Sequence, residues 1–499
     1  MNIFRSISRI ILIIALVAVP PSAVAQQKII SAISETPMPN ATLYLPAPPD
    51  SLSLAFSNDV YQYMLAKNIR ETDRGTQAYN DVPYGTEQMI SRMSPIIGLS
   101  ISNTATPELY QLFTSAISAI GKTCIGPKNY YRRRRPFDRF GDSPFTPERP
   151  ASLISQGSYP SAHSMLGWAA ALVLCQINPE QADDIITSGW EYGQSRVIAG
   201  VHWQSDVDAS RMMSAASVAR LLGNNTYIEQ LTRAQEEYDR ITGHSRTSNL
   251  NDRIPLFSFL PPPPDSTGAA FAADVTQLFA TKPLRITDRG QQAIEHADIS
   301  PQGLCRIFSR ELHLDLSQTE TPEIYQLLKL VSEVSLKQNQ YAREAYTRLR
   351  PLARFNTEKL ITTENADSLI STNSYPSLHA TTGWLAAMLL TGVAPEHQNN
   401  ILITGREIGQ SRVITAANYQ SDVDAGRLQA GILAAIIAND PDILAQLNRA
   451  GEEYREKNAS VPAIHQENGH APEYTLDGRP ATTLSRGIIV SKNSKILRP

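Results

Sequence analysis

The chain has 499 residues and a formal net charge of −3, with 42% hydrophobic and 19% charged residues. This length predicts two or three domains, and this apolar content predicts folded cores rather than a disordered chain. The near balance of acidic and basic residues argues against nucleic acid or an anionic membrane surface as a partner.

The N-terminus has the pattern of a secretory signal peptide. Arg5 and Arg9 precede an apolar run over residues 10–19, and the small residues of AVA at 23–25 suit cleavage. The alternative, a membrane anchor, is disfavoured because a bilayer core needs about 20 apolar residues. We therefore expect residues 1–25 to be a signal peptide, and the mature chain to be periplasmic or secreted and to have no membrane span.

Several segments of the sequence occur twice in the same order. LPAPPDS returns as LPPPPDS (45–51 and 260–266), SYPS returns unchanged (158–161 and 374–377), and GQSRVIAGVHWQSDVDA returns as GQSRVITAANYQSDVDA (193–209 and 409–425). The distance between the copies is far longer than the about 20–50 residues of a solenoid repeat. It indicates a duplicated domain.

The duplication divides the chain into two repeats of ordinary domain size. We expect the first repeat at 44–238, a polar linker at 239–258 and the second repeat at 259–454. The tail, residues 458–499, is polar with scattered Gly, Pro, Asn and Lys, and it should add little to either core.

The hydrophobic pattern within the repeats is helical. HSMLGWAAALVLCQI at 163–177 is an apolar run better suited to a buried helix than to a strand. Farther along, residues 205–222 place Ala209, Met212 and Met213 at i, i+3 and i+4, on one face of a helix. Alternating strand patterns are scarce, so we predict an all-α fold.

Three clusters in the first repeat combine basic and hydrogen-bonding residues. In the first, KNYYRRRRP, Lys128 and Arg135 are seven residues apart, which would place them on one helical face after two turns. A solvated basic patch is the alternative, since runs of charge are usually exposed.

The second cluster, YPSAHS, is typical of a helix start with Ser161 near the N-cap, where free backbone amides and the helix dipole suit a phosphate-like anion. The alternative is an ordinary cap with His163 facing solvent. In the third cluster, SRVIAGVHWQSD, His202 and Asp206 are four apart. The carboxylate could hold one imidazole nitrogen and leave the other as a nucleophile, although such a pair alone is usually structural.

Taken in order, the clusters resemble the signature of the class A bacterial non-specific acid phosphatases, K-x6-R-P, P-S-G-H and S-R-x5-H-x3-D. Those enzymes belong to the type-2 phosphatidic acid phosphatase superfamily, which shares its pocket with the vanadium haloperoxidases. The flanking GSYPS, GWA, ALVL, INP and HWQSDVDA are also similar to class A enzymes. The resemblance covers the first repeat and, more weakly, the second. It implies two tandem helical-bundle domains of the acid phosphatase and haloperoxidase type.

The resemblance also implies a role for each matching residue. His202 would attack phosphorus and form a phosphohistidine, Asp206 would orient His202, and His163 would protonate the leaving group. The phosphoryl oxygens would be held by Lys128, Arg135, Arg196, Ser161 and the backbone N–H of Ala162. Because three fixed cations can neutralise the transferred group, the resemblance implies small phosphomonoesters as substrates and no metal or other cofactor.

One residue of the first repeat departs from the family pattern. Ala162 stands where the family has glycine. If φ is positive at this position, alanine would cost about 1–2 kcal/mol and its N–H would tilt away from phosphate. If φ is negative, the methyl group would only narrow the pocket, and we expect activity to be retained.

The second repeat departs more seriously. Asn418 replaces the nucleophile, Arg343 the lysine and Leu378 the glycine, whereas the other positions persist as Arg350, Ser377, His379, Arg412 and Asp422. A carboxamide cannot form a phosphohistidine, so we expect this repeat to be inactive. It could pack on the first repeat as an intramolecular pseudo-dimer, or bind an anion without turnover.

The three cysteines, Cys124, Cys175 and Cys305, fit no zinc motif and allow at most one bridge within the chain. A Cys124–Cys175 bridge within the first repeat is favoured, and the state of Cys305 is left open.

An exported acid phosphatase is the preferred function, with three alternatives. A vanadate-dependent haloperoxidase is disfavoured by the flanking sequence, and lipid phosphatases of the superfamily usually span the membrane several times. A phosphate-binding or scaffolding protein, inactive in both repeats, would follow if Ala162 disables the first. Hydrolysis of p-nitrophenyl phosphate in the presence of a chelator separates an enzyme from a binding protein.

Overall fold

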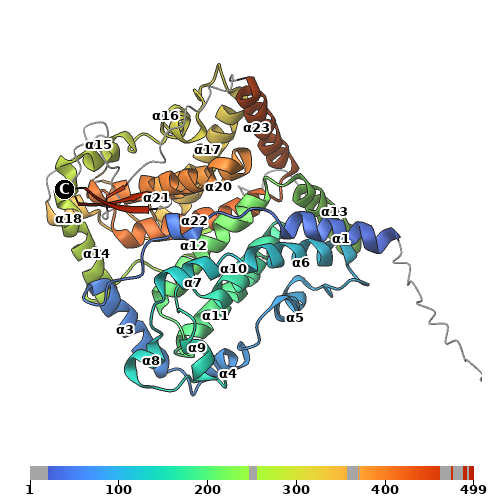
Figure 1. Ribbon diagram of the computed structural model, residues 1–499, viewed down its shortest axis with the longest axis horizontal. Coiled ribbons are helices and arrows are strands. Elements are labelled where there is room, and N and C mark those ends of the chain that lie inside the picture. The colour runs from blue at the N-terminus through green and yellow to red at the C-terminus, as the bar shows by residue number, and fades with distance from the viewer. Residues whose placement is uncertain are drawn as a thin grey trace, which may run out of the picture. The chain divides into compact units, whose positions relative to one another are not determined.

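Helices form most of the regular structure, as the sequence predicts (Figure 1). The computed structural model describes residues 21–244, 246, 256–356, 369 and 371–460, and three short strands near the C-terminus. Residues 1–20 of the predicted signal peptide and residues 245 and 247–255 of the predicted linker lie outside the described residues.

The N-terminal part of the chain, which includes the first repeat, is a succession of helices. These are α1 (Pro21–Ser34), α2 (Ala41–Tyr44), α3 (Leu54–Lys67), α4 (Asp73–Asn80), α5 (Thr86–Ile97), α6 (Pro107–Gly121), α7 (Ile125–Tyr131), α8 (Pro136–Phe140), α9 (Pro150–Ile154), α10 (Ala162–Cys175), the 3-10 turn η1 (Pro179–Gln181), α11 (Ala182–Ile198), α12 (Gln204–Leu221) and α13 (Asn225–Thr242). The last helix continues into the first residues of the predicted linker, 239–258.

The second repeat has a similar succession. Its elements are η3 (Leu256–Phe259), α14 (Ala269–Ala280), η4 (Lys282–Ile286), α15 (Asp288–Glu295), α16 (Pro301–Leu312), α17 (Pro322–Ala345), α18 (Pro351–Phe355), α20 (Leu378–Val393), η5 (Pro395–His397), α21 (Gln398–Ile414), α22 (Gln420–Ile437) and α23 (Pro441–Ser460).

Three helices form the centre of each repeat: α10, α11 and α12 in the first, and α20, α21 and α22 in the second. Helix α10 is apolar all round, and nearly all of its residues are buried, as expected for a central helix. Its N-cap is Ser161, whose side chain accepts a hydrogen bond from the Ser164 N–H. Helix α11 approaches α10 closely at Gly189, where an added Cβ would lie 2.7 Å from the Cβ of Ala171.

The two repeats contact each other through equivalent helices. Helix α12 packs on α20 and α22, α10 packs on α22, and α3 packs on α14 (Figure 1). Gly223 and Gly392 meet with their backbones, since a Cβ on Gly223 would lie 2.5 Å from the Gly392 carbonyl oxygen. The Asn439 Nδ2 donates hydrogen bonds to the carbonyl oxygens of Gln176 and Ile177, at 2.8 and 3.0 Å.

The polar tail contains the strands β1 (Tyr474–Thr475), β2 (Gly487–Ser491) and β3 (Ser494–Arg498), which form an antiparallel sheet in the order β1-β2-β3. They belong to a separate unit, residues 455–499. These strands are not predicted from the sequence. Their signal is short: GIIVS in β2 and SKILR in β3 contain the β-branched residues that favour strands.

The three cysteines are unpaired and buried, so the favoured Cys124–Cys175 bridge is wrong. Cys124 is the N-cap residue of α7, and Cys175 ends α10. Burial raises the pKa of both thiols. These residues behave as small apolar side chains of the core.

In the part of the chain that the structure describes, no single helix has the length and apolar character needed to cross a membrane. Counted together, α22 and α23 reach that length and composition, but a bend of 101° separates them.

We predict that Gly223→Ala weakens the packing between the repeats. The added methyl group would collide with backbone atoms of Gly392, which cannot rotate away, and overpacking of this kind costs about 1–3 kcal/mol. Thermal unfolding should show a lower Tm. The control is Gly126→Ala in α7, where an added Cβ has no atom within 4 Å and should leave the Tm unchanged or raise it slightly. An unchanged Tm in Gly223→Ala would contradict this contact.

Candidate active site

The predicted site residues come from the start of α10 and from four other segments. Ser161, Ala162 and His163 belong to this start, and the other residues are Lys128 on α7, Arg135 before α8, Arg196 in the last turn of α11, and His202 and Asp206 at the start of α12. Hydrogen bonds hold these segments together: the Ser161 N–H donates to the Asp206 carbonyl oxygen, the His202 N–H donates to the Arg196 carbonyl oxygen, and Arg135 contacts the His202 ring.

Lys128 and Arg135 do not share a helical face, contrary to the prediction. Helix α7 ends at Tyr131, Arg132 adopts a left-handed conformation with φ of 44°, and Arg135 is the N-cap residue of α8. Both side chains are nevertheless buried, with 8% and 4% of their surface exposed. The alternative of a solvated basic patch is therefore wrong for these two residues.

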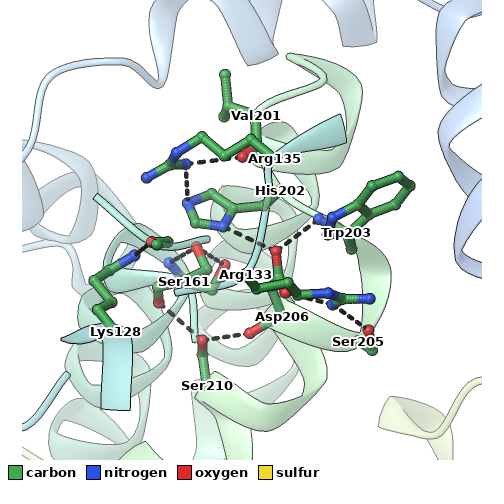
Figure 2. Close-up of polar contacts among 12 residues, drawn as sticks. Lys128, Arg133, Arg135, Ser161, Val201, His202, Trp203, Ser205, Asp206 and Ser210 are labelled. Atoms are coloured by element: carbon green, nitrogen blue, oxygen red, sulfur yellow. Dashed lines mark hydrogen bonds and ion pairs between the residues drawn. The ribbon is translucent and has the colours of Figure 1, made fainter. Parts of the chain in front are cut away.

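His202 lies between a carboxylate and a guanidinium (Figure 2). Its Nδ1 is 3.3 Å from Oδ2 of Asp206, and its Nε2 is 3.1 Å from Nη1 of Arg135. Burial and the neighbouring Arg135 lower the pKa of His202 well below its usual range. The imidazole is therefore neutral near pH 7, with Nδ1–H donating to Asp206 and the Nε2 lone pair turned toward the basic residues.

Asp206 remains ionised in the interior because of Arg133, which the sequence analysis does not single out. Nη1 of Arg133 donates to Asp206 Oδ1 at 2.6 Å, and Nη2 donates to Asp59 Oδ2 at 2.7 Å. Burial alone would raise the pKa of Asp206, but Arg133 and the hydrogen bond with His202 outweigh burial and lower it. Figure 2 shows Arg133 and Ser205 beside this carboxylate.

The start of α10 is tied to the same aspartate. The Ser161 N–H donates to the Asp206 carbonyl oxygen at 3.1 Å, and Oγ of Ser210 donates to the carbonyl oxygens of Ser161 and Asp206. Ala162 is the first residue of α10 and is not among the residues with positive φ. The methyl group therefore causes no left-handed strain and only narrows the space before the helix N-terminus.

His163 is held by the segment before α5. Its Nε2 is 3.0 Å from the Val82 carbonyl oxygen, and its ring lies between Tyr84 and Tyr192, with centroid distances of 4.8 and 5.8 Å. The hydrogen bond requires the proton on Nε2, which leaves the Nδ1 lone pair uncommitted. Burial and the nearby Arg196 lower the pKa of His163 well below its usual range, so this imidazole is also neutral at pH 7.

Arg196 is oriented by a residue that the sequence analysis missed. Nη2 of Arg196 contacts both carboxylate oxygens of Glu148, at 2.7 and 2.6 Å. The Nε and Nη1 atoms are buried and have no hydrogen-bond partner among the described residues. Buried N–H groups are rarely left unpaired, so these two atoms are suited to an oxyanion. No sequence motif marks Glu148, because its partner is 48 residues away.

The second repeat reproduces this frame with a different centre. Arg348 pairs with Asp422 and Asp274 as Arg133 pairs with Asp206 and Asp59. Asn418 replaces His202, and its Nδ2 donates to the Ser374 carbonyl oxygen at 2.6 Å. Burial raises the pKa of Asp422, the opposite of the shift at Asp206.

In the ranges that the structure describes, no group of three or more His, Cys, Asp or Glu side chains could hold a metal ion.

We predict that Arg133→Met lowers the stability of the fold, because it leaves Asp206 and Asp59 buried without a cation. Such a change costs about 3–5 kcal/mol. Arg133 lowers the pKa of Asp206 in the folded state, so its stabilisation is present above the pKa of an unfolded aspartate and is lost as the pH falls. The difference from the wild type in denaturant unfolding should be fully present between about pH 5 and pH 7 and should shrink as the pH falls below about 4.

Arg134→Met is the matched control within the same RRRR run, because its side chain is 60% exposed and pairs with Asp138 on the surface. It should change stability little. Equal losses of unfolding free energy in the two variants would show that the buried ion pair stabilises the fold no more than the surface pair does.

Comparison with known proteins agrees with this site. The model of the PAP2 superfamily matches residues 107–227 and 330–443, one region in each repeat. The chain is 39% identical over 198 residues to a non-specific acid phosphatase of Providencia stuartii, covering 40% of this chain and 80% of that protein. It is 38% identical over 199 residues to a non-specific acid phosphatase of Salmonella typhimurium, with the same coverage.

A more distant relative, an acid phosphatase of Zymomonas mobilis, is 28% identical over 226 residues, covering 44% of this chain and 86% of that protein. The matches cover most of each relative, and the superfamily model matches both repeats. The chain therefore belongs to the PAP2 superfamily and, within it, to the non-specific acid phosphatases.

Proposed function

We propose that the protein is an exported acid phosphatase that hydrolyses organic phosphomonoesters in the first repeat through a phosphohistidine. The observation that carries the proposal is the position of His202. Asp206 engages Nδ1, and Nε2 is turned toward Arg135. A nucleophilic lone pair beside fixed cations is the arrangement that phosphoryl transfer needs, and family membership supports the same chemistry.

In the first step, Nε2 of His202 attacks phosphorus, and the bond between phosphorus and the ester oxygen breaks. The leaving alkoxide takes a proton from His163. In the second step, water attacks the phosphohistidine and gives a proton back to His163, which releases inorganic phosphate and restores neutral His202. Because Nε2 of His163 is bonded to the Val82 carbonyl, the proton exchanged with substrate is carried on Nδ1.

The transferred group is held by fixed positive charge. Lys128, Arg135 and Arg196 supply three cations, and the two unpartnered nitrogens of Arg196 supply N–H donors. Ser161 and the Ala162 N–H, at the start of α10, supply further hydrogen bonds and the favourable end of the helix dipole. We propose that this set needs no metal ion.

Substrate binding prepares the acid. In the empty site, burial and neighbouring cations hold the pKa of both histidines well below the usual range. A phosphoester brings two negative charges, which offset Arg196 and Lys128 and raise the pKa of His163. His163 therefore acquires its proton with the substrate, whereas the Nε2 lone pair of His202 is used in the attack on phosphorus.

The second repeat is proposed to be inactive and to serve as the structural partner of the first. Asn418 has no nucleophilic nitrogen, and its Nδ2 is engaged by the Ser374 carbonyl. The contacts of α20 and α22 with α10 and α12 support an intramolecular pseudo-dimer.

We predict that residues 26–499 hydrolyse p-nitrophenyl phosphate in EDTA and that His202→Ala lowers kcat on the order of 10⁴- to 10⁶-fold, as other nucleophile deletions do. The measurement is steady-state release of nitrophenolate. The matched control is Asn418→Ala in the second repeat, which should keep kcat within about twofold. Substantial activity in His202→Ala would contradict the mechanism, and activity that requires a divalent ion would contradict metal independence.

His163→Ala should affect substrates according to their leaving groups. Nitrophenolate leaves without much protonation, whereas the alkoxide of glycerol phosphate needs a proton. We expect the loss of kcat to be at least tenfold larger for glycerol phosphate, by the usual 10²–10⁴-fold worth of an acid. Equal losses on the two substrates would argue against His163 as the acid.

The pH dependence of kcat/KM should depend on Lys128. Burial and the neighbouring Arg135 lower the pKa of Lys128 to about 8, so the free enzyme loses this cation as the pH rises through that value. We expect kcat/KM to fall above about pH 8. Lys128→Arg keeps the charge at higher pH and should move this alkaline limb upward by at least one pH unit, even if the maximum rate is lower. An unchanged limb would assign it to another group.

A further inference from the structure

The second repeat keeps the basic residues of the first. Arg350 stands at the position of Arg135, Arg412 at that of Arg196, and Arg343 at that of Lys128. Arg350 and Arg412 are buried, with 3% and 1% of their surface exposed, whereas Arg343 at the end of α17 is partly exposed. Arg350 is held in place by hydrogen bonds to the Thr372 hydroxyl and to the carbonyl oxygens of Asn373 and Ala417.

Hydrogen bonds bring the segments that carry these three arginines together. Arg350 Nη1 donates to the Ala417 carbonyl oxygen at 2.9 Å, the Asn418 N–H donates to the Arg412 carbonyl oxygen at 3.1 Å, and Asn373 Nδ2 donates to the Arg343 carbonyl oxygen at 2.9 Å. After burial, the same three arginines lower the pKa of His379. The equivalent imidazole, His163, is acted on by Arg196 and Lys128 in the same way. The basic residues of the second repeat therefore surround the same point of the fold as those of the first.

The backbone frame around that point is also the same in both repeats. Three hydrogen bonds have nearly the same length in the two repeats. The Ser377 N–H donates to the Asp422 carbonyl at 2.9 Å, and the Ser161 N–H donates to the Asp206 carbonyl at 3.1 Å. Arg350 Nη1 is 2.9 Å from the Ala417 carbonyl, as Arg135 Nη1 is 2.8 Å from the Val201 carbonyl, and both His379 Nε2 and His163 Nε2 are 3.0 Å from a carbonyl oxygen, of Ala297 and Val82 respectively. Ser377, Arg350 and His379 are thus held in the second repeat in the same way as Ser161, Arg135 and His163 in the first.

The two repeats differ in the residue at the position of His202 and in the space beside that residue. Asn418 turns its Nδ2 to the Ser374 carbonyl, and its Oδ1 is 3.4 Å from Oγ of Ser377. Leu378 replaces Ala162 as the first residue of the central helix. The larger side chain narrows the approach to the helix N-terminus and leaves less space for the organic part of an ester.

From this combination we propose that the second repeat is a binding site for inorganic phosphate, held by Arg343, Arg350 and Arg412 without turnover. The charge and the frame suit an oxyanion, Asn418 cannot attack it, and Leu378 excludes the ester group. Inorganic phosphate is also the product of the reaction proposed for the first repeat, so the two sites of one chain would bind the same ion with different consequences.

The test is the number of phosphate ions bound per chain, measured on residues 26–499 by isothermal titration calorimetry with inorganic phosphate. The wild type should bind two ions. Lys128→Ala and Arg343→Ala are matched substitutions at equivalent positions, and each should leave one ion bound or weaken one of the two sites at least tenfold. The double variant should lose both. Binding of one ion per wild-type chain would overturn the proposal, and so would binding of two ions with unchanged affinity in Arg343→Ala.

Arg343 is partly exposed, so its substitution should leave the fold intact, and circular dichroism with thermal unfolding checks this. Arg412→Gln is the second variant, at the buried position, and should also abolish one site. Phenylphosphonate, which resembles an ester and cannot be hydrolysed, should bind once per chain. Binding of two phenylphosphonates would overturn the exclusion of esters. Hydrolysis is measured separately, so an inactive chain that still binds two phosphates would reject the proposed function and keep this inference.

Discussion

The ion pair between Arg133 and Asp206 is the interaction on which the geometry of the first repeat depends. Asp206 has no exposed surface, and a carboxylate at such a depth is tolerated only when it is paired and hydrogen-bonded. Its side chain accepts hydrogen bonds from the Trp203 backbone at 2.9 Å and from Arg133 at 2.6 Å, and its carbonyl accepts the Ser161 N–H. One buried residue thereby links the segment after α7, the start of α10 and the start of α12. His202 and the N-terminus of α10 are positioned by the same group.

The second repeat keeps this frame around a different central residue. Arg348 and Asp422 preserve the ion pair, and Ser377 preserves the link to the central helix. The electrostatic result is nevertheless reversed. Burial and the neighbouring Asp274 raise the pKa of Asp422, whereas Arg133 and the hydrogen bond with His202 lower that of Asp206. The pKa of Asp206 is lowered and that of Asp422 is raised within the same arrangement of helices. The arrangement of helices is therefore kept even though the residue at the position of His202 and the pKa of its aspartate partner differ between the repeats.

Local features of the fold and site are readable from the sequence, and long-range partners are not. The cap at Ser161, the buried helix that follows it and the contact between His202 and Asp206 depend on spacings of three or four residues, which helical geometry determines. Lys128 and Arg135 do not lie on one helical face as the sequence predicts, because the left-handed conformation of Arg132 ends the helix between them.

Arg133 and Glu148 were missed because nothing local distinguishes them. Arg133 is one of four consecutive arginines, and its carboxylate partners lie 73 and 74 residues away in the chain. Glu148 meets Arg196 only after α10 and α11 have packed. A bridge between Cys124 and Cys175 was equally undecidable from spacing, since a disulfide depends on a distance that only the tertiary structure determines.

The contact between the repeats has consequences for how the two sequences can diverge and for how the association depends on protein concentration. In a symmetric homodimer every substitution appears on both sides of the axis, so a surface such as that between α12 and α22 cannot lose a catalytic group on one side alone. Here both sides belong to one chain, and the two centres have diverged while equivalent helices remained in contact. The covalent link also makes the association intramolecular, so its strength does not depend on protein concentration. Dilution, which separates the subunits of a non-covalent dimer, cannot separate these two halves.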